Sequence, residues 1–244
     1  MQIAPSLHRL GNGSVNAYLV EDGGEVTIVD AGLPGYWGDL PAELAAMGRG
    51  LDDVRALVLT HGHSDHVGFA ERFRVERSIL PQIHELDAAM ARGEVKPEHQ
   101  QSGKTRIGPL VGFLLFGVRK GALRAKPLAE VATFGDGATL DVPGAPRVVH
   151  VPGHSPGSAA LHFAGRDALL VGDAFATLAV SSGHTGPQIS PFTSDPAEAL
   201  ASLARIEAIE ARWALPGHGE PWTGGVGAAV AAVRERVASG VPVG

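Results

Sequence analysis

Cysteine is absent from the 244 residues of this chain. Its absence excludes disulfide bonds, thiolate nucleophiles and zinc sites built on cysteine, so any metal site must use other side chains. Aromatic residues are scarce at 5%, and no apolar run reaches the ~20 residues that a membrane-spanning helix needs. The sequence therefore predicts no transmembrane segment.

A surplus of basic residues is also missing. The formal net charge is −6 at pH 7, from 20 Lys and Arg residues against 26 Asp and Glu residues. Proteins that bind nucleic acids are usually basic, so we expect a small-molecule substrate and no nucleic-acid partner. Residues 1–5 lack the basic and apolar regions of a signal peptide, and we therefore expect a cytoplasmic protein.

Histidine and aspartate, by contrast, are concentrated in residues 61–66, which read HGHSDH and follow an apolar strand expected at residues 56–59. Imidazole and carboxylate are ligands that zinc and similar divalent metals prefer. Alternate residues of an extended chain point the same way, so His61 and His63 can present nitrogens to one ion. Asp65 and His66 follow where the chain must turn, and can face a second ion. A polar loop that happens to be rich in histidine is the weaker alternative.

Three further polar residues each come directly after an apolar strand. His154 stands in PGHSPG, Asp173 follows LLVG, and His218 stands in PGHG. Each alone could be a turn residue, but the repeated pattern of strand, glycine and ligand favours one shared site. Asp30 follows the strand expected at residues 26–29 and comes shortly before Gly32, where a site residue and a simple turn residue are equally compatible with the sequence.

Strand patterns precede helix patterns in both halves of the chain, without a linker. Strands are expected at residues 7–10, 17–20, 26–29, 78–80, 159–163 and 168–171, and helices at 41–47, 84–92, 197–209 and 226–238. This order predicts a single α/β domain over residues 1–244, an αββα sandwich of two mixed β-sheets with outer helices.

Residues 93–126 depart from this pattern, and we interpret them as an insertion. Their centre, residues 107–118, reads IGPLVGFLLFGV and is followed by Arg119, Lys120, Arg124 and Lys126. Three interpretations are open: a helix buried in the core, an apolar lid over a substrate pocket, or a surface that meets a partner or lipid headgroups. We favour the lid, because binding loops tend to lie in loosely patterned insertions.

Together these motifs resemble the metallo-β-lactamase-fold hydrolases, especially their glyoxalase II-like and lactonase-like branches. The resemblance covers nearly the whole chain. It rests on the segments NAYL (16–19), VDAG (29–32), HGHSDH (61–66), GHSPGS (153–158), GD (172–173) and PGHG (216–219).

The resemblance implies a centre of two divalent metal ions, with zinc favoured and manganese or iron as alternatives. The implied ligands are His61, His63 and His154 for the first ion, Asp65, His66 and His218 for the second, and Asp173 bridging both. Asp30 would support the metal-binding loop from behind the ligands. Asp65 would also hold the nucleophile and relay a proton. His184, in the loop after Asp173, is a candidate substrate contact.

The implied reaction is attack of a metal-bridging hydroxide on a carbonyl carbon, which cleaves a carboxylic ester, lactone or thioester. Lactone is favoured, because glyoxalase II-like enzymes usually carry an added helical domain and this chain ends soon after His218. The missing secretion signal makes β-lactam hydrolysis a weaker candidate. A flavodiiron-like redox protein, whose branch has a carboxylate where His63 stands, ranks below these, as does a non-catalytic metal-binding protein. The sequence leaves a homo-oligomer open.

Overall fold

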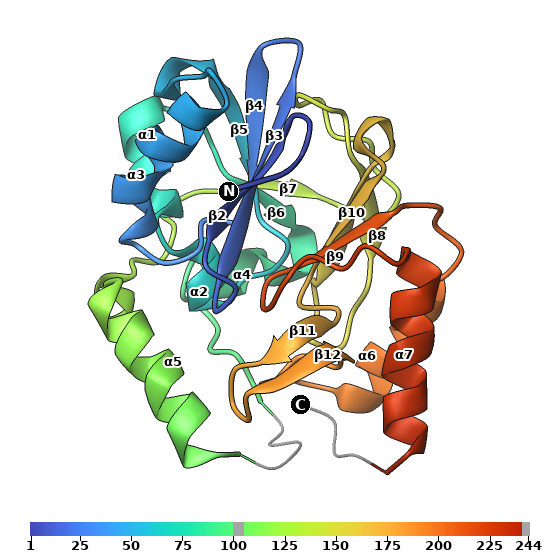
Figure 1. The fold of residues 1–244 in the computed structure, drawn as a ribbon. Coiled ribbons are helices and arrows are strands. Elements are labelled where there is room, and N and C mark those ends of the chain that lie inside the picture. The colour runs from blue at the N-terminus through green and yellow to red at the C-terminus, as the bar shows by residue number, and fades with distance from the viewer. Residues whose placement is uncertain (100–104, 241–244) are drawn as a thin grey trace.

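Two β-sheets packed face to face form the centre of the computed structural model, which describes residues 1–99 and 105–240 (Figure 1). The first sheet has seven strands in chain order: β1 (Gln2–Ala4), β2 (Leu7–Gly11), β3 (Asn16–Asp22), β4 (Glu25–Val29), β5 (Val54–Val58), β6 (Gln82–His84) and β7 (Ala132–Phe134). Strands β1 to β4 are antiparallel, and β4 to β7 are parallel. The sheet is therefore mixed.

The second sheet has four strands in the order β13 (Trp213–Pro216), β10 (Ala168–Gly172), β9 (Ala159–Phe163) and β8 (Arg147–His150). It is also mixed, because β13 runs parallel to β10 while β8, β9 and β10 pair antiparallel. Strands β11 (Ala176–Ala179) and β12 (His184–Gln188) form a separate antiparallel pair.

Helices cover the outer faces of both sheets (Figure 1). The α-helices are α1 (Tyr36–Ala46), α2 (Ser64–Val67), α3 (Ala70–Arg77), α4 (Ala88–Ala91), α5 (Ile107–Arg119), α6 (Pro196–Ser202) and α7 (Val226–Ala238). Short 3-10 helices span Leu51–Asp53, Glu85–Asp87, Ala122–Arg124, Ala164–Arg166 and Leu203–Arg205. Helices α1 and α3 lie on the first sheet, and α6 and α7 lie on the second.

The alternation of side chains along each strand builds the four layers. Leu57 of β5 packs outward with the α1 and α3 side chains, whereas its neighbour Val58 packs inward between the sheets. Leu169 and Leu170 of β10 divide in the same way between the α6/α7 layer and the sheet interface. The α/β/β/α order that the sequence predicts is confirmed.

Several local predictions were wrong. Residues 78–80 form no strand, and the strand lies at β6 instead. The helix predicted over 84–92 is divided into a 3-10 helix and α4, because the Asp87 carboxylate turns inward to accept the Gly62 N–H. The helix predicted over 197–209 ends as α6 at Ser202, whose hydroxyl donates to the carbonyls of Ala199 and Pro152.

The apolar segment 107–118 is helical, as α5, but it is not a core helix. Gly117 is its one buried residue, while Ile107 is 81% and Leu115 is 64% exposed. Residues 100–104 of the predicted insertion lie outside the described residues. A single domain with an insertion at about 93–126 stays a prediction. No helix among the described residues is long and apolar enough to cross a membrane.

Candidate metal centre

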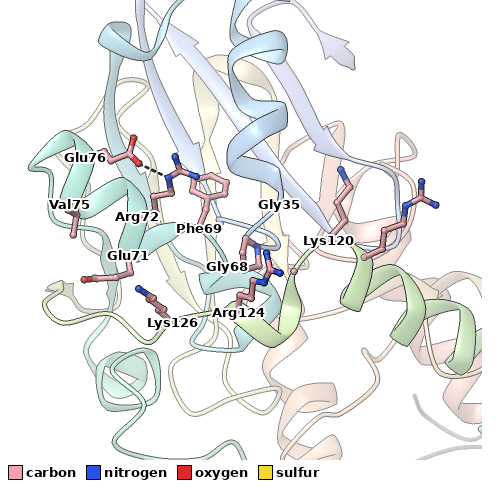
Figure 2. Close-up of a pocket in the computed structure, with 13 residues that line it drawn as sticks. Gly35, Gly68, Phe69, Glu71, Arg72, Val75, Glu76, Lys120, Arg124 and Lys126 are labelled. Carbon is pink, nitrogen blue, oxygen red and sulfur yellow. Dashed lines mark hydrogen bonds and ion pairs between the residues drawn. The ribbon is translucent and has the colours of Figure 1, made fainter.

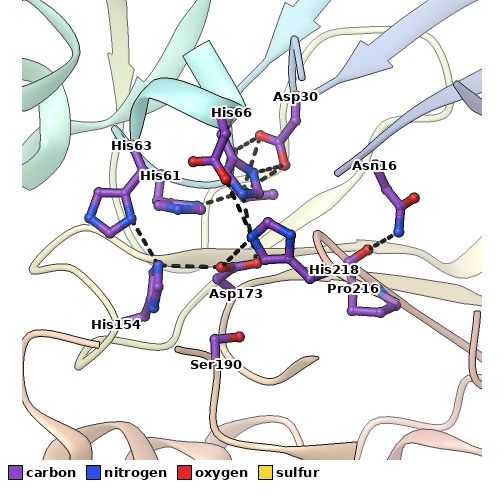
Figure 3. Close-up of polar contacts among 12 residues, drawn as sticks. Asn16, Asp30, His61, His63, His66, His154, Asp173, Ser190, Pro216 and His218 are labelled. Carbon is purple, nitrogen blue, oxygen red and sulfur yellow. Dashed lines mark hydrogen bonds and ion pairs between the residues drawn. The ribbon is translucent and has the colours of Figure 1, made fainter. Parts of the chain in front are cut away.

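Loops that leave five different strands meet at one end of the sandwich, and each carries a polar side chain. Asp30 follows β4, His61 follows β5, His154 follows β8, Asp173 follows β10 and His218 follows β13. In Figure 3, Asp173 lies in the middle, with His63 and His154 to one side and His218 to the other. The ends of strands from both sheets thus build one cluster.

The donor atoms of this cluster form three overlapping groups in which all atoms lie within 4.8 Å of one another. The groups are His61, His63 and His154; His61, His66 and Asp173; and Asp65, His66 and His218. The seven residues that the sequence suggests as ligands therefore lie close together in space, although they are spread along the chain from position 61 to position 218.

Asp173 is the residue that touches both sides of the cluster. Its Oδ2 atom lies 3.4 Å from His154 Nε2 and 3.3 Å from His218 Nε2, and its Oδ1 atom lies 3.7 Å from His66 Nε2. Gly217 makes room beside it, since a Cβ atom there would come within 2.4 Å of Asp173 Oδ1. Any side chain at position 217 would therefore clash with this carboxylate.

Asp30 holds the loop from behind. Its left-handed backbone, with φ +62°, is a conformation that aspartate tolerates better than most residues, and its carboxylate faces Thr60 and His66. The carboxylate accepts the N–H and hydroxyl of Thr60 at 2.8 Å each, and Nδ1 of His66 donates to it at 2.9 Å. His66 is thereby fixed with Nε2 facing the cluster.

The other histidines are oriented in the same manner. His218 Nδ1 donates to the Ser14 carbonyl. The Thr193 hydroxyl donates to the Ser190 carbonyl at 2.7 Å, so it accepts from His154 Nδ1 at 3.1 Å. By the same reasoning the Thr60 hydroxyl, which donates to Asp30, accepts from Nδ1 of His61. In each of these rings Nε2 is therefore the nitrogen that could bind a metal.

Unpartnered atoms test whether this cluster fits a metal. Nε2 of His61, His63 and His66 and Oδ1 of Asp173 are buried and have no hydrogen-bond partner among the described residues. Buried polar atoms without a partner are costly, and such atoms here converge on one another. Nitrogen and oxygen donors in this number and arrangement fit divalent ions such as zinc. The residues present therefore fit a metal centre.

The pKa values divide the histidines into two kinds. Burial and the neighbouring imidazoles hold the pKa values of His61 and His154 well below the usual range, and burial lowers the pKa of His63 to about 4. Burial alone would also lower the pKa of His66, but Asp30 and Asp173 raise it to about 10. The first three rings are therefore neutral, the form that binds metal.

Sequence reasoning missed Asp87, which is fully buried beside the cluster. Its carboxylate accepts the Gly62 N–H at 2.8 Å, the Ser155 hydroxyl at 2.6 Å and the Gly157 N–H at 2.6 Å. These partners lie in the loops that carry His61 and His154. Asp87 ties the two loops together, and no local motif marks it in the sequence.

A cavity of about 300 Å³ opens beside His63 and Asp65. Its other lining residues are Leu33, Ser64, Pro97, His99, Phe113, Leu114, Gly117, Val118, Ala122, Leu123 and Phe192. His99, which no sequence motif marks, stacks edge-on against His63 at 5.3 Å and contacts the Phe192 carbonyl through Nδ1 at 2.8 Å. Phe113 of α5 lies edge-on to His218 at 6.0 Å. Helix α5 therefore forms one apolar wall of this cavity.

His184, the candidate substrate contact, lies in β12 and is exposed. The Arg236 guanidinium donates to its Nε2, so its ring faces helix α7. It is not among the residues that line the cavity beside His63.

An αββα sandwich with histidine and aspartate donors clustered at one end defines a class, the metal-dependent hydrolases of this fold. A sequence profile described as the metallo-beta-lactamase superfamily matches residues 10–218. The chain belongs to the metallo-beta-lactamase superfamily and is a metal-dependent hydrolase.

Curated relatives agree with this assignment. YobT of Bacillus subtilis (strain 168) is 32% identical over 66% of this chain and 62% of its own length, so the chain spans less than two thirds of that relative. "Probable metallo-hydrolase YybB" of the same organism is 28% identical over 84% of this chain and 81% of its own. A hydroxyacylglutathione hydrolase of Fuscovulum blasticum is 29% identical over 79% of this chain and 57% of its own length.

Solved structures share the fold. A metallo-beta-lactamase family protein from Thermus thermophilus superimposes with a TM-score of 0.69 at 27% identity, over 98% of this chain and 80% of the other. The protein TTHA1623, solved in a di-iron-bound form, superimposes with a TM-score of 0.62 at 27% identity, over 93% of this chain and 97% of the other. The predicted αββα fold is thus confirmed by comparison as well.

Proposed function

We propose that this chain is a di-metal hydrolase that cleaves a carboxylic ester, lactone or thioester, with lactone favoured. The observation that carries the proposal is the convergence of buried, unpartnered donor atoms from His61, His63, His66 and Asp173. A cytoplasmic location is part of the same proposal and rests on the sequence alone.

Two ions would be held by the ligands that the motifs suggest. His61, His63 and His154 would hold the first ion, Asp65, His66 and His218 the second, with Asp173 between them. When bound, such ions polarise a substrate carbonyl and lower the pKa of a water from its high bulk value towards about 7. Zinc suits these donors, and the di-iron-bound neighbour supports iron as the alternative.

Asp65 is the proposed catalytic residue of the protein itself. Its side chain is 23% exposed, more than that of any other proposed ligand, and it lines the cavity beside His63. One carboxylate oxygen lies 3.4 Å from His218 Nε2. A carboxylate placed between the ligands and the cavity can accept a proton from the nucleophile and pass it to the leaving group.

The cavity wall supports the choice of substrate. Phe113, Leu114 and Val118 of α5 line the same cavity as His63, so an acyl chain attached to the reacting carbonyl would meet apolar side chains. This wall favours a lactone or ester that carries such a chain. The hydroxyacylglutathione hydrolase relative supports thioester hydrolysis as the second candidate.

A substrate panel tests the proposal. The protein loaded with zinc, manganese or iron is assayed on acylated and unacylated lactones, p-nitrophenyl esters, a glutathione thioester and a β-lactam. We expect the acylated lactone to give the largest kcat/KM. We expect Asp65→Asn to lose most of this rate, whereas Asp136→Asn, at an exposed aspartate, keeps it. The proposal fails if the metal-loaded protein hydrolyses none of these compounds.

A further inference from the structure

Helix α5 carries an apolar stripe on its solvent-exposed side. The exposed residues Ile107, Val111, Leu114, Leu115 and Val118 recur at helical spacing, and no charged residue lies between positions 107 and 118. Leu123, just beyond the helix, is 83% exposed. Single exposed apolar residues are ordinary, but a continuous stripe of this length marks a surface that binds something. We call these six residues the α5 stripe.

The helix is held in place although none of the residues that the structure describes covers its outer side. At its start, the Arg106 N–H donates to the Ser181 carbonyl at 3.0 Å, and just beyond its end the Gly35 N–H donates to the Lys120 carbonyl at 2.8 Å. Phe113 and Phe116 pack on the core beneath. In Figure 1, α5 (green) accordingly stands at the outer edge of the molecule, away from both sheets. The stripe is presented on a fixed helix.

Basic residues flank the stripe in an otherwise acidic protein. Arg106 precedes it, and the exposed Arg119, Arg124 and Lys126 follow it. The last three line a pocket of about 570 Å³ next to the helix end, where Figure 2 shows Arg124 and Lys126. The carboxylates in that pocket, Glu71 and Glu76, are each already paired with an arginine of α3. Excess positive charge therefore remains beside the apolar surface.

We infer that the α5 stripe and its flanking basic residues form a docking surface for an anionic lipid bilayer. An exposed apolar helix edged with arginine and lysine binds at the interface, with its apolar side among the acyl chains and its cations at the headgroups. The helix lies in the plane of the membrane and does not cross it. A second copy of this chain fits less well, because a two-fold pairing of α5 helices would bring Arg106 and Arg119 of both copies together.

The docked orientation also determines how a substrate reaches the cavity, and this step of the inference rests on the proposed function. Leu114 and Val118 belong to the stripe and also line the cavity beside His63. The mouth of the cavity therefore meets the lipid surface, so an acylated substrate dissolved in the bilayer reaches the metal cluster without crossing water.

Vesicle co-sedimentation tests the docking without any assay of activity. The full chain is mixed with vesicles of phosphatidylglycerol and phosphatidylcholine in equal parts, and with vesicles of phosphatidylcholine alone. We expect binding to the anionic vesicles to be at least ~10-fold tighter and to weaken with salt, because each basic residue near the surface adds to the attraction. Equal binding to both vesicles, or none, overturns the inference.

Two sets of variants identify the surface. Ile107→Glu, Val111→Glu and Leu115→Glu together place charge on the stripe without touching the cavity lining, and Arg119→Glu with Arg124→Glu reverses the flanking charge. Each set should weaken binding by ~10-fold or more. Leu80→Glu and Arg55→Glu, at exposed sites outside α5, are the matched controls and should bind as wild type.

The two sets also guard against failed folding, because the arginine variants change only exposed charges. Vesicle binding that survives both sets overturns the inference. A concentration-dependent dimer in sedimentation equilibrium that the stripe variant abolishes, without vesicle binding, also overturns it in favour of self-association. Hydrolysis of water-soluble esters is measured separately, so loss of the proposed activity and loss of docking are distinguishable.

Discussion

The two sides of the cavity beside His63 are built in opposite ways. On one side, the clustered histidines and Asp173 are buried, and the rings of His66, His154 and His218 are oriented by the hydrogen bonds that they donate to Asp30, Thr193 and the Ser14 carbonyl. On the other side, helix α5 is exposed along most of its length and meets the core chiefly through two phenylalanines. We call these sides the metal floor and the α5 wall.

Because of this difference, we expect the metal floor to determine the reaction and the α5 wall to determine which substrate is accepted. Rings that are locked by hydrogen bonds keep the geometry of metal ligands within narrow limits, which the chemistry of bond cleavage requires. A wall of apolar side chains on one helix can change without disturbing those ligands. Substitutions in the floor should therefore change rate and metal content, and substitutions in the wall should change which acyl chain is accepted.

The largest effect is expected at Asp173, the carboxylate that contacts both halves of the cluster. Asp173→Asn removes its charge, and we expect loss of at least one metal ion and a fall in kcat/KM beyond the roughly 10–100-fold cost of losing a supporting residue. Metal content by elemental analysis and kcat/KM on the best ester measure this. Retention of two ions per chain at near wild-type rate would show that Asp173 is not a ligand.

The next effect is expected at Asp87, which touches no metal ligand directly. Asp87→Asn replaces an acceptor of two backbone N–H groups by an amide that itself carries hydrogens. We expect metal affinity to fall by about 10–100-fold, and the free energy of unfolding by about 1–3 kcal/mol. Chelator competition and urea unfolding provide the two values. Asp136→Asn is the control, because exposed Asp136 also accepts a backbone N–H, from His150 at 2.9 Å.

The floor could be predicted from the sequence to the extent that its residues carry local signals. His61 to His66 are adjacent, and His154, Asp173 and His218 each follow an apolar strand and a glycine. The αββα layers followed from the order of strands and helices. Asp87 carries no such signal, because its backbone partners are 25 and 70 positions away in the chain.

The wall was predictable only in part. Its apolar composition left a core helix, a lid and a binding surface open, and the segment forms helix α5 at residues 107–119. Which side of a helix is covered depends on contacts with Lys120, Ser181 and the core, and these come from distant parts of the chain. The strand expected at residues 78–80 forms later in the chain, as β6, for the same reason. Its position is determined by pairing with β5 and β7.

A smaller effect, confined to long substrates, is expected at Phe113. Phe113→Ala removes an aromatic ring from the cavity beside His218, so the KM for an acylated lactone should rise by about 10-fold, as expected for lost apolar burial. The KM for the unacylated lactone should change little. The ratio of the two values is compared with that of Ile107→Ala, on the same helix but outside the cavity lining. An equal rise in KM for both lactones would show that Phe113 does not contact the acyl chain and acts with the metal floor instead.

The smallest effect is expected on the outer side of the wall. Leu115→Ala should change the free energy of unfolding by less than about 0.5 kcal/mol. Leu40→Ala, the same substitution at a fully buried residue of α1, should cost about 2–5 kcal/mol. Urea unfolding at low protein concentration measures both. A loss above ~1 kcal/mol for Leu115→Ala would mean that the stripe is covered in the free protein, and the contrast between floor and wall would then no longer hold.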